Sequence, residues 1–287
     1  ETVALSQFWQ GPAGLTGSAV QSLEDGWAWM AALPDGRRYL QIAVDVASAA
    51  LPPRKALAQR CAERFKAIEA AQPFLRDATP LGEPIARAST PVLNEVLTGE
   101  DWLRVGDAAM AVDPLSGNGL FQALSSSLQA PAVIRTMLHS PERAALAREF
   151  HRRRIEHLFY RFARIGRDFY ASEEGWAEAP FWQARRGWPD GEPLPRPFTA
   201  AAGVVARRPV VRQDEIVEAD VVLTPDQPLG MWHLDGLALA DALSAVRAAP
   251  PGQDPGVALA ARLDLRPDRA AALADWMRRQ GWIAAGT

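Results

Sequence analysis

The chain has 287 residues, 48% of them hydrophobic, which is enough for a sizeable core in one large domain or in a large and a small one. With 31 basic and 34 acidic residues the formal net charge is −3, so no attraction to nucleic acid is expected. The single cysteine, Cys61, excludes an internal disulfide framework and a cysteine-rich metal site, and it favours the cytoplasm.

The N-terminal part of the chain is predicted to form a β-sheet over residues 1–50. Side chains alternate in character at residues 27–29 and again at residues 39–44. Between these two runs lies Pro34-Asp35-Gly36, which favours a tight turn. A β-hairpin is therefore expected.

A helix is predicted over residues 54–72, because apolar side chains recur there at spacings of three and four. These side chains are Leu57, Cys61, Phe65 and Ile68. Residues 85–90 and 102–105 are expected to form short strands. Because no run of about 18 apolar residues occurs, no membrane span is expected.

Two helices are predicted in the middle of the chain. The first covers residues 119–138, and Pro131 is expected to kink or break it. The second covers residues 141–171. Residues 176–200 are rich in Trp, Pro and Arg, and this composition indicates a loop or linker.

A small C-terminal module is predicted after a boundary near residue 200. Its β-branched residues 204–224 indicate strands, and three helices and a short final strand follow, at residues 235–248, 256–263, 267–280 and 282–283. This order resembles a winged-helix-like module. Its 9 arginines and 11 acidic residues give it a negative balance, which favours peptide or protein recognition over DNA binding. A purely structural capping role is the alternative.

The segment richest in chemical information runs from residue 102 to residue 120. A short apolar run leads into Gly106-Asp107, and a turn containing Pro114, Gly117 and Gly119 opens the next helix. Glycines let the backbone approach a ligand closely, and the first turn of a helix offers free N–H groups to an electron-rich atom. A glycine-rich turn with a purely structural role is the alternative.

This segment resembles the second flavin-binding motif of the FAD-dependent monooxygenase and reductase superfamily. The match consists of Gly106-Asp107-Ala108-Ala109, Asp113-Pro114 and Gly117-Asn118-Gly119. The resemblance implies that Asp107 binds ribose or ribitol hydroxyls, and that the amides of residues 115–119 face the flavin ring. The implied FAD-binding residues are Gly106, Asp107, Pro114, Leu115, Ser116, Gly117, Asn118 and Gly119.

Two aromatic stretches narrow the resemblance to the tryptophan-halogenase-like class. One is Gly26-Trp27-Ala28-Trp29 followed by Leu33-Pro34, and the other joins Phe169-Tyr170 to Ala179-Pro180-Phe181-Trp182. In that class the sheet covers the substrate pocket. The resemblance therefore implies that Trp27 and Trp29, which share one face of a strand, contact the substrate. Ordinary packing of these aromatic side chains is the alternative.

The resemblance implies an α/β (α+β) fold, namely the C-terminal part of a glutathione-reductase-like, hydroxylase-type FAD fold with a substrate-domain sheet. The three expected parts are a substrate-domain sheet and helix (1–95), the second half of the FAD-binding domain (96–200) and the C-terminal module (201–287). No Gly-x-Gly-x-x-Gly follows a strand, and the first residue is Glu1. An upstream segment or a second chain carrying that fingerprint is therefore the expected partner.

The implied activity is an FAD-dependent monooxygenation of an aromatic, indole-type substrate, with electrons from NAD(P)H or reduced flavin and with O₂ as oxidant. An appended module suits a protein or peptide substrate. One family that fits hydroxylates a tryptophan side chain during maturation of quinohemoprotein amine dehydrogenase, toward its tryptophylquinone cofactor. A flavin-dependent halogenase, a geranylgeranyl-reductase-like flavoenzyme, and a non-catalytic protein-binding module on a degenerate flavin fold are the alternatives. No catalytic residue is assigned, and no metal site is expected from the four histidines.

Overall fold

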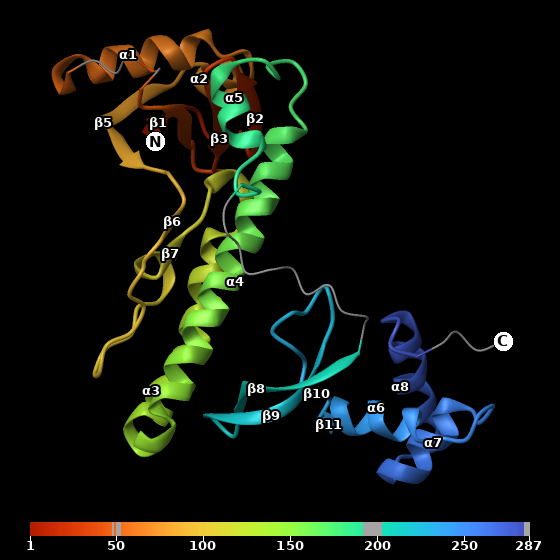
Figure 1. Cartoon of the computed structure of the whole chain (residues 1–287). Helices are drawn as coiled ribbons and strands as arrows, with labels where there is room; N and C mark the ends of the chain where they lie inside the picture. The colour runs from red at the N-terminus through yellow and green to blue at the C-terminus, as the bar shows by residue number, and fades with distance from the viewer. Residues whose placement is uncertain (48, 50–52, 192–202, 284–287) are drawn as a thin grey trace. The chain divides into compact units, whose positions relative to one another are not determined.

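The computed structural model describes residues 1–47, 49, 53–191 and 203–283 (Figure 1). The chain divides into two compact units, and the long helices α3 and α4 contribute to both. Unit 1 comprises Glu1–Val96, Arg104–Ser126 and His157–Glu192, and unit 2 comprises Leu97–Leu103, Ser127–Glu156 and Pro193–Thr287. The expected boundary near residue 200 lies outside the described residues, and the three-part division stays a prediction.

Unit 1 is built on a five-stranded antiparallel sheet with the strand order β2-β3-β4-β1-β5. The strands are β1 (Thr2–Gln10), β2 (Gly17–Leu23), β3 (Gly26–Ala32), β4 (Arg37–Asp45) and β5 (Thr79–Ala88). The hairpin expected around Pro34-Asp35-Gly36 is present as β3 and β4. Strand β5 begins six residues before the expected residue 85, because it pairs with β1 along most of its length.

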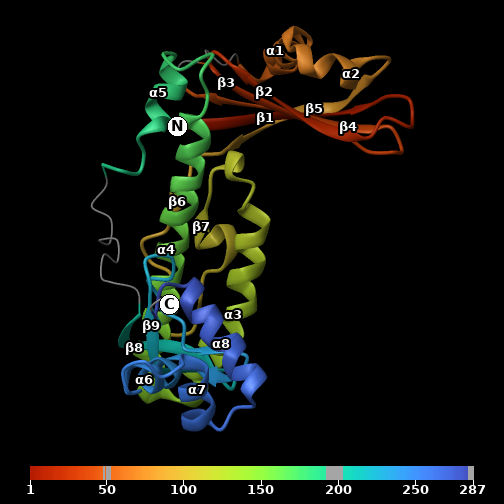
Figure 2. The same ribbon diagram turned by 90° about the vertical axis from the view of Figure 1, so that its right-hand side faces the viewer.

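One face of this sheet is covered by helical segments (Figure 2). These are α1 (Arg54–Ala67), the 3₁₀ turn η1 (Glu69–Ala71) and α2 (Gln72–Leu75). Cys61 and Phe65 of α1 are fully buried against Leu40 and Ile42 of β4, so Cys61 has the packing role of a small apolar side chain. The expected helix over residues 54–72 ends early, because Ile68 adopts an extended conformation.

The rest of unit 1 holds the predicted flavin motif. Its elements are β6 (Val92–Leu93), η2 (Gly106–Ala108), β7 (Met110–Ala111), η3 (Pro114–Ser116), the start of α3 (Gly119–His139), the end of α4 (Ala144–Ala171) and α5 (Pro180–Arg186). The strand expected at residues 102–105 is absent, since only Leu103 makes an isolated bridge, and the short strand near the motif is β7. The expected loop after residue 176 contains α5, which Pro180 opens and whose Phe181 and Trp182 are buried.

Pro131 does not break helix α3, which continues to His139. A proline inside a helix removes one backbone donor, and the remaining turns of this 21-residue helix retain theirs. The second long helix has its expected span, with η4 (Pro141–Arg143) leading into α4. No helix within the described ranges is both long and apolar enough to cross a membrane.

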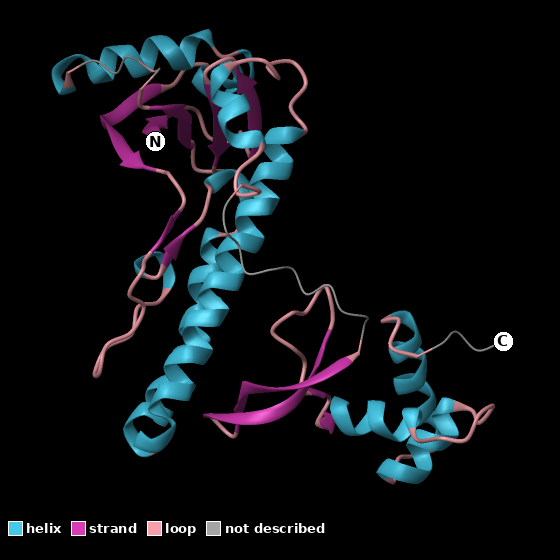
Figure 3. Ribbon diagram, viewed as in Figure 1, coloured by secondary structure: helices cyan, strands magenta, loops and turns pink. Residues whose placement is uncertain are grey.

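Unit 2 contains the C-terminal strands and helices (Figure 3). They are β8 (Val204–Arg212), β9 (Glu215–Leu223), β10 (His233–Leu234), β11 (Leu237–Ala238), α6 (Leu239–Arg247), α7 (Pro255–Leu263) and α8 (Pro267–Arg279). The expected helix at residue 235 starts four residues later, because Asp235 and Gly236 have positive φ and form the turn between β10 and β11. Trp282 forms no strand; it is buried in the helical core, edge-on to Trp276.

Candidate functional site

The turn between β7 and α3 is shaped by Asp113. Its side-chain Oδ1 accepts a hydrogen bond from the Leu115 N–H at 2.9 Å, and its backbone carbonyl accepts one from the Ser116 hydroxyl at 2.7 Å. An aspartate before a proline suits this geometry, because the carboxylate caps the 3₁₀ turn that Pro114 begins. Gly117 then takes φ +67°, a left-handed conformation that glycine adopts without strain. This turn directs the chain into α3.

The turn leaves its glycines open on one side. A Cβ added at Gly117 or Gly119 would meet no atom within 4 Å. The amides at the start of the 21-residue helix α3 also lack intrahelical carbonyl partners. A planar ligand with an electron-rich edge therefore has access to backbone donors here. We call residues 113–119 the flavin turn.

Gln122, in the first turn of α3, has a buried side-chain amide. Its side chain is 1% exposed, and within the described part of the chain neither Oε1 nor Nε2 has a hydrogen-bond partner. A buried amide without partners costs about 1–3 kcal/mol. Its donor and acceptor suit a ligand edge that carries both, as the flavin pyrimidine ring does. The residues of this region therefore fit a flavin, and no pattern in the sequence pointed to Gln122.

Asp107 and Gly106 sit where the motif predicts a hydroxyl-binding carboxylate. The Asp107 side chain is exposed and makes no hydrogen bond to another described residue, so it is free to accept one from a sugar. Gly106 has φ +55°, and its N–H donates to the Ser126 hydroxyl at 2.9 Å. A Cβ at Gly106 would lie 3.4 Å from that of Ala123, which is ordinary contact, so the positive φ is what requires glycine.

Asp113 also joins the flavin turn to α4. The Tyr170 hydroxyl donates to Asp113 Oδ2 at 2.9 Å, and both side chains are buried. Burial raises the pKa of the Asp113 carboxyl, and the hydrogen bonds from Leu115 and Tyr170 only partly offset this. Burial and the neighbouring Asp113 charge likewise raise the pKa of the Tyr170 phenol, so Tyr170 stays a donor at neutral pH. Asp113 stood in the sequence motif, whereas its bond to Tyr170 required the fold.

An aromatic cluster packs on the uncovered face of the sheet, beside the flavin turn. Trp27 is 4% exposed and contacts a group of residues from β4, α4, α5 and the flavin turn. That group is Ala43, Tyr170, Phe181, Trp182 and Leu115. The Trp182 indole donates to the Leu23 carbonyl at 2.8 Å, which fastens α5 to the turn between β2 and β3. Leu115 thus ties the flavin turn to this face of the sheet.

Arg185 holds α5 in this position. Its guanidinium donates to the Thr2 hydroxyl at 2.7 Å and to Asp45 at 3.1 Å, and it lies 3.9 Å from the centre of the Phe181 ring. Although burial raises the pKa of Asp45, the hydrogen bond from Arg185 helps to hold it below the ordinary value. The aromatic cluster is therefore clamped to the first and fourth strands.

Beyond the aromatic cluster, the same sheet face stays open to a ligand. The register places Trp29, Gln41 and Ser6 in one row and Tyr39 and Phe8 in the next. The Tyr39 ring centre lies 5.1 Å from that of Phe8 and 5.4 Å from that of Trp29, and its hydroxyl donates to Gln41 Oε1 at 2.9 Å. Phe8 is 47% exposed. We call Phe8, Trp29, Tyr39 and Gln41 the aromatic platform.

The sequence placed Trp27 and Trp29 on one face, and they share that face. Trp27 packs beneath Tyr170 and Phe181, whereas Trp29 is half-buried and borders the open part. Phe8 and Tyr39 of the platform were not singled out, although Tyr39 begins the alternating run at residues 39–44. Their pairing across β1 and β4 is a matter of register, which the local sequence does not fix.

The fold matches those of solved flavin-dependent halogenases and of a flavin-fold hydroxylase. No protein-family model matches the chain. The solved structure of CmlS, a flavin-dependent halogenase, superposes with a TM-score of 0.70 over 98% of this chain and 62% of its own, at 15% identity, a likeness of fold alone. A curated tryptophan 2-halogenase of Chondromyces crocatus is 28% identical over 172 residues, which are 58% of this chain and 32% of that protein.

A closer likeness is to QhpG, a peptidyl tryptophan dihydroxylase essential for tryptophylquinone cofactor biogenesis. Its structure matches with a TM-score of 0.78 and 48% identity. The match covers 98% of this chain and 64% of that one, so the chain spans slightly less than two thirds of the QhpG length. The mixed helix-and-sheet fold and the resemblance to the tryptophan-halogenase-like class, both predicted from the sequence, are confirmed.

Proposed function

We propose that this chain serves an FAD-dependent monooxygenase that hydroxylates a tryptophan side chain within a protein or peptide, on the way to a tryptophylquinone cofactor. The observation that carries this proposal is the 48% identity to QhpG, in a match that covers 98% of this chain. The platform supports it chemically, since neighbouring aromatic rings beside a polar Gln41 suit an indole, which has a flat apolar body and one N–H donor.

In this proposal the flavin turn and Asp107 hold the cofactor. The Gly117 N–H donates to the Pro114 carbonyl at 3.0 Å, so the amide of Gly119 at the start of α3 would be the donor to the pyrimidine edge, where it would stabilise negative charge. When bound, reduced FAD supplies oxygen activation, with electrons from NAD(P)H or reduced flavin. For each hydroxylation one atom of O₂ enters a C–H bond of the indole and the other leaves as water, with two electrons and two protons consumed. The aromatic side chains exclude water and orient the indole.

A partner segment or chain that carries the Gly-x-Gly-x-x-Gly half of the flavin site belongs to this proposal. The start of α3 presents Leu120, Phe121 and Leu124 at exposures of 75%, 63% and 57%. Three large apolar side chains in one helical turn make a surface that a protein normally covers. We place the upstream half of the FAD-binding fold on it. The compartment we propose is the cytoplasm.

A flavin-dependent halogenase is the second candidate, and the likeness to the tryptophan 2-halogenase favours it. Both candidates share the cofactor and an aromatic substrate, so the product distinguishes them. A non-catalytic binding protein on this fold is the third candidate, and it consumes no oxygen.

The test uses the full-length protein loaded with FAD, supplied with NAD(P)H and a tryptophan-containing peptide in chloride or bromide buffer. We expect peptide-dependent oxygen uptake and a peptide mass increased by one or two oxygen atoms on the indole. A halogen in the product would replace the hydroxylase assignment with the halogenase. Bound FAD with no oxygen uptake under any of these conditions would favour the non-catalytic candidate.

A further inference from the structure

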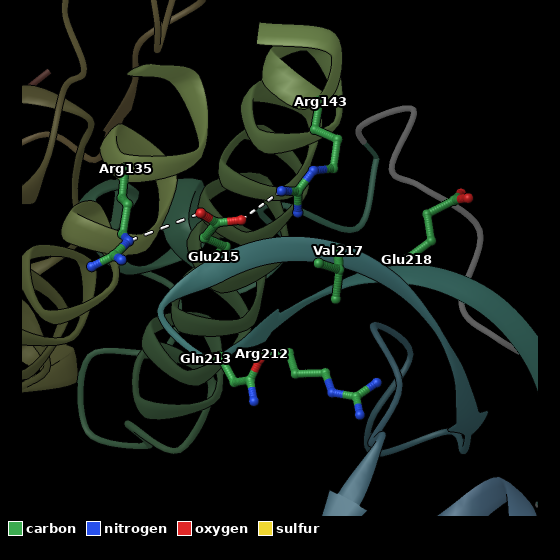
Figure 4. A pocket seen from close by; sticks show the side chains of 7 residues that line it. All are labelled: Arg135, Arg143, Arg212, Gln213, Glu215, Val217 and Glu218. Atoms are coloured by element: carbon green, nitrogen blue, oxygen red, sulfur yellow. Dashed lines mark hydrogen bonds and ion pairs between the residues drawn. The ribbon is translucent and has the colours of Figure 1, made fainter. Parts of the chain in front are cut away.

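A cavity of about 630 Å³ lies in unit 2, which holds neither the flavin turn nor the aromatic platform (Figure 4). Three arginines, two glutamates, Gln213 and Val217 line it. It lies where the tip of the β8–β9 hairpin meets the corner between α3 and α4. Its volume falls in the range of pockets that bind small molecules, about 300–1,000 Å³, and greatly exceeds that of one inorganic ion.

The floor of this cavity is fixed before any ligand arrives. The Ile216 N–H donates to the Thr136 hydroxyl at 2.7 Å, and both residues are fully buried. Arg143 donates to the Ile216 carbonyl at 3.2 Å and to the Ser140 hydroxyl at 2.6 Å. These bonds join the hairpin to the helical corner, so a ligand would lose little free energy to ordering the site.

Positive charge predominates among the lining side chains. Glu215 lies between two arginines, with Oε2 2.5 Å from Arg143 Nη2 and Oε1 3.9 Å from Arg135 Nε (Figure 4). One carboxylate therefore faces two guanidinium groups. The second glutamate, Glu218, is exposed and lies 3.9 Å from Arg207, which is outside the lining.

Arg135 and Arg212 keep donors for a ligand. The ion pair with Glu215 at 3.9 Å is the polar contact of Arg135 within the described residues, and it is too long for a hydrogen bond. The Arg212 guanidinium lies 6.0 Å from the ring centre of Trp232, at the outer limit of a cation–π contact. Each guanidinium presents a planar fork of N–H groups that matches the two oxygens of a carboxylate.

We propose that this cavity binds an acidic segment of the protein substrate, with its carboxylates on Arg135 and Arg212. The identity of the partner rests on the proposed function, whereas the charge preference rests on the cavity alone. The volume accommodates consecutive side chains, and Val217 supplies an apolar wall for their methylene groups. The site gives the C-terminal hairpin a role in holding the substrate chain.

The test measures binding of hexaglutamate to the full-length protein by calorimetry, with free glutamate, inorganic phosphate and hexalysine as comparison ligands. Hexaglutamate is expected to bind, and its affinity should fall as salt rises. Free glutamate and phosphate should bind at least tenfold more weakly, because each is small enough to reach one arginine at a time. Arg135→Gln and Arg212→Gln should each weaken hexaglutamate binding about tenfold, the effect of one charge-assisted hydrogen bond. Arg279→Gln, an exposed arginine on α8 outside the lining, is the matched control.

The three variants should share the melting temperature of the parent, because none of these arginines is buried. Failure of hexaglutamate to bind, or equal weakening by Arg279→Gln, would overturn the proposal. Phosphate or glutamate binding as tight as hexaglutamate would replace it with a small-anion site. These binding measurements need no turnover. If the parent protein does not hydroxylate tryptophan, the proposed function is refuted, and the test of the cavity is unaffected.

Discussion

Replacing Tyr170 with phenylalanine removes one hydroxyl from the buried contact that joins α4 to the flavin turn. Asp113 Oδ2 then loses the donor at 2.9 Å, in a place where the aspartate is 6% exposed. Leaving a buried carboxylate oxygen without its donor costs about 2 kcal/mol, and a loss of that size lowers the melting temperature by roughly 5 °C. The Leu115 N–H still caps Oδ1, so the turn itself should persist.

The loss should depend on pH in a defined direction. The folded pKa of Asp113 lies above its ordinary value of 3.8, chiefly because of burial. Its contribution to stability is therefore complete below 3.8 and is lost as pH rises through the folded pKa. Tyr170 holds that folded pKa down, so Tyr170→Phe raises it further. The difference in unfolding free energy between the parent and Tyr170→Phe should consequently be larger at neutral pH than in acid.

Urea unfolding of the full-length protein at neutral and at acidic pH measures this difference. Tyr160→Phe is the matched control, since Tyr160 lies on the same helix, contacts the Phe159 ring, and makes no hydrogen bond to another described residue. A loss that is equal at both pH values, or no larger than that of Tyr160→Phe, would refute the role assigned to the Asp113–Tyr170 bond.

Two further substitutions test the flavin turn and the platform. Gly117→Ala should weaken FAD binding at least tenfold, because it places a methyl group on the open side of the turn. Gly82→Ala is its control, since Gly82 also has a positive φ, +68°, and open space around it. Both substitutions cost roughly 1–2 kcal/mol of backbone strain, but Gly82→Ala should leave the FAD affinity unchanged. Phe8→Ala should raise KM for a tryptophan peptide several-fold with less than about 1 kcal/mol lost in stability, because Phe8 is 47% exposed. Val257→Ala, at a 57% exposed position on α7 outside the sheet, is its control, and an equal rise in KM there would contradict the platform.

Local chemistry made much of the fold predictable. The Pro34-Asp35-Gly36 turn specified a hairpin, and the recurring apolar positions around Cys61 and Phe65 specified a helix. The strand predicted at residues 102–105 is absent, because a short apolar run has the same pattern whether or not a partner strand is available. The helix does not break at Pro131, since the cost of one lost hydrogen bond is offset by the rest of a long helix.

The sequence by itself determined the flavin turn, because glycine, aspartate and proline impose that backbone shape through their own dihedral preferences and caps. Only the tertiary structure decided what surrounds the turn. Tyr170 reaches Asp113 across 57 residues, and Phe8 meets Tyr39 through strand register. Such contacts depend on packing between distant segments, whose free energy is a property of the assembled core and has no signature in the spacing of neighbouring residues.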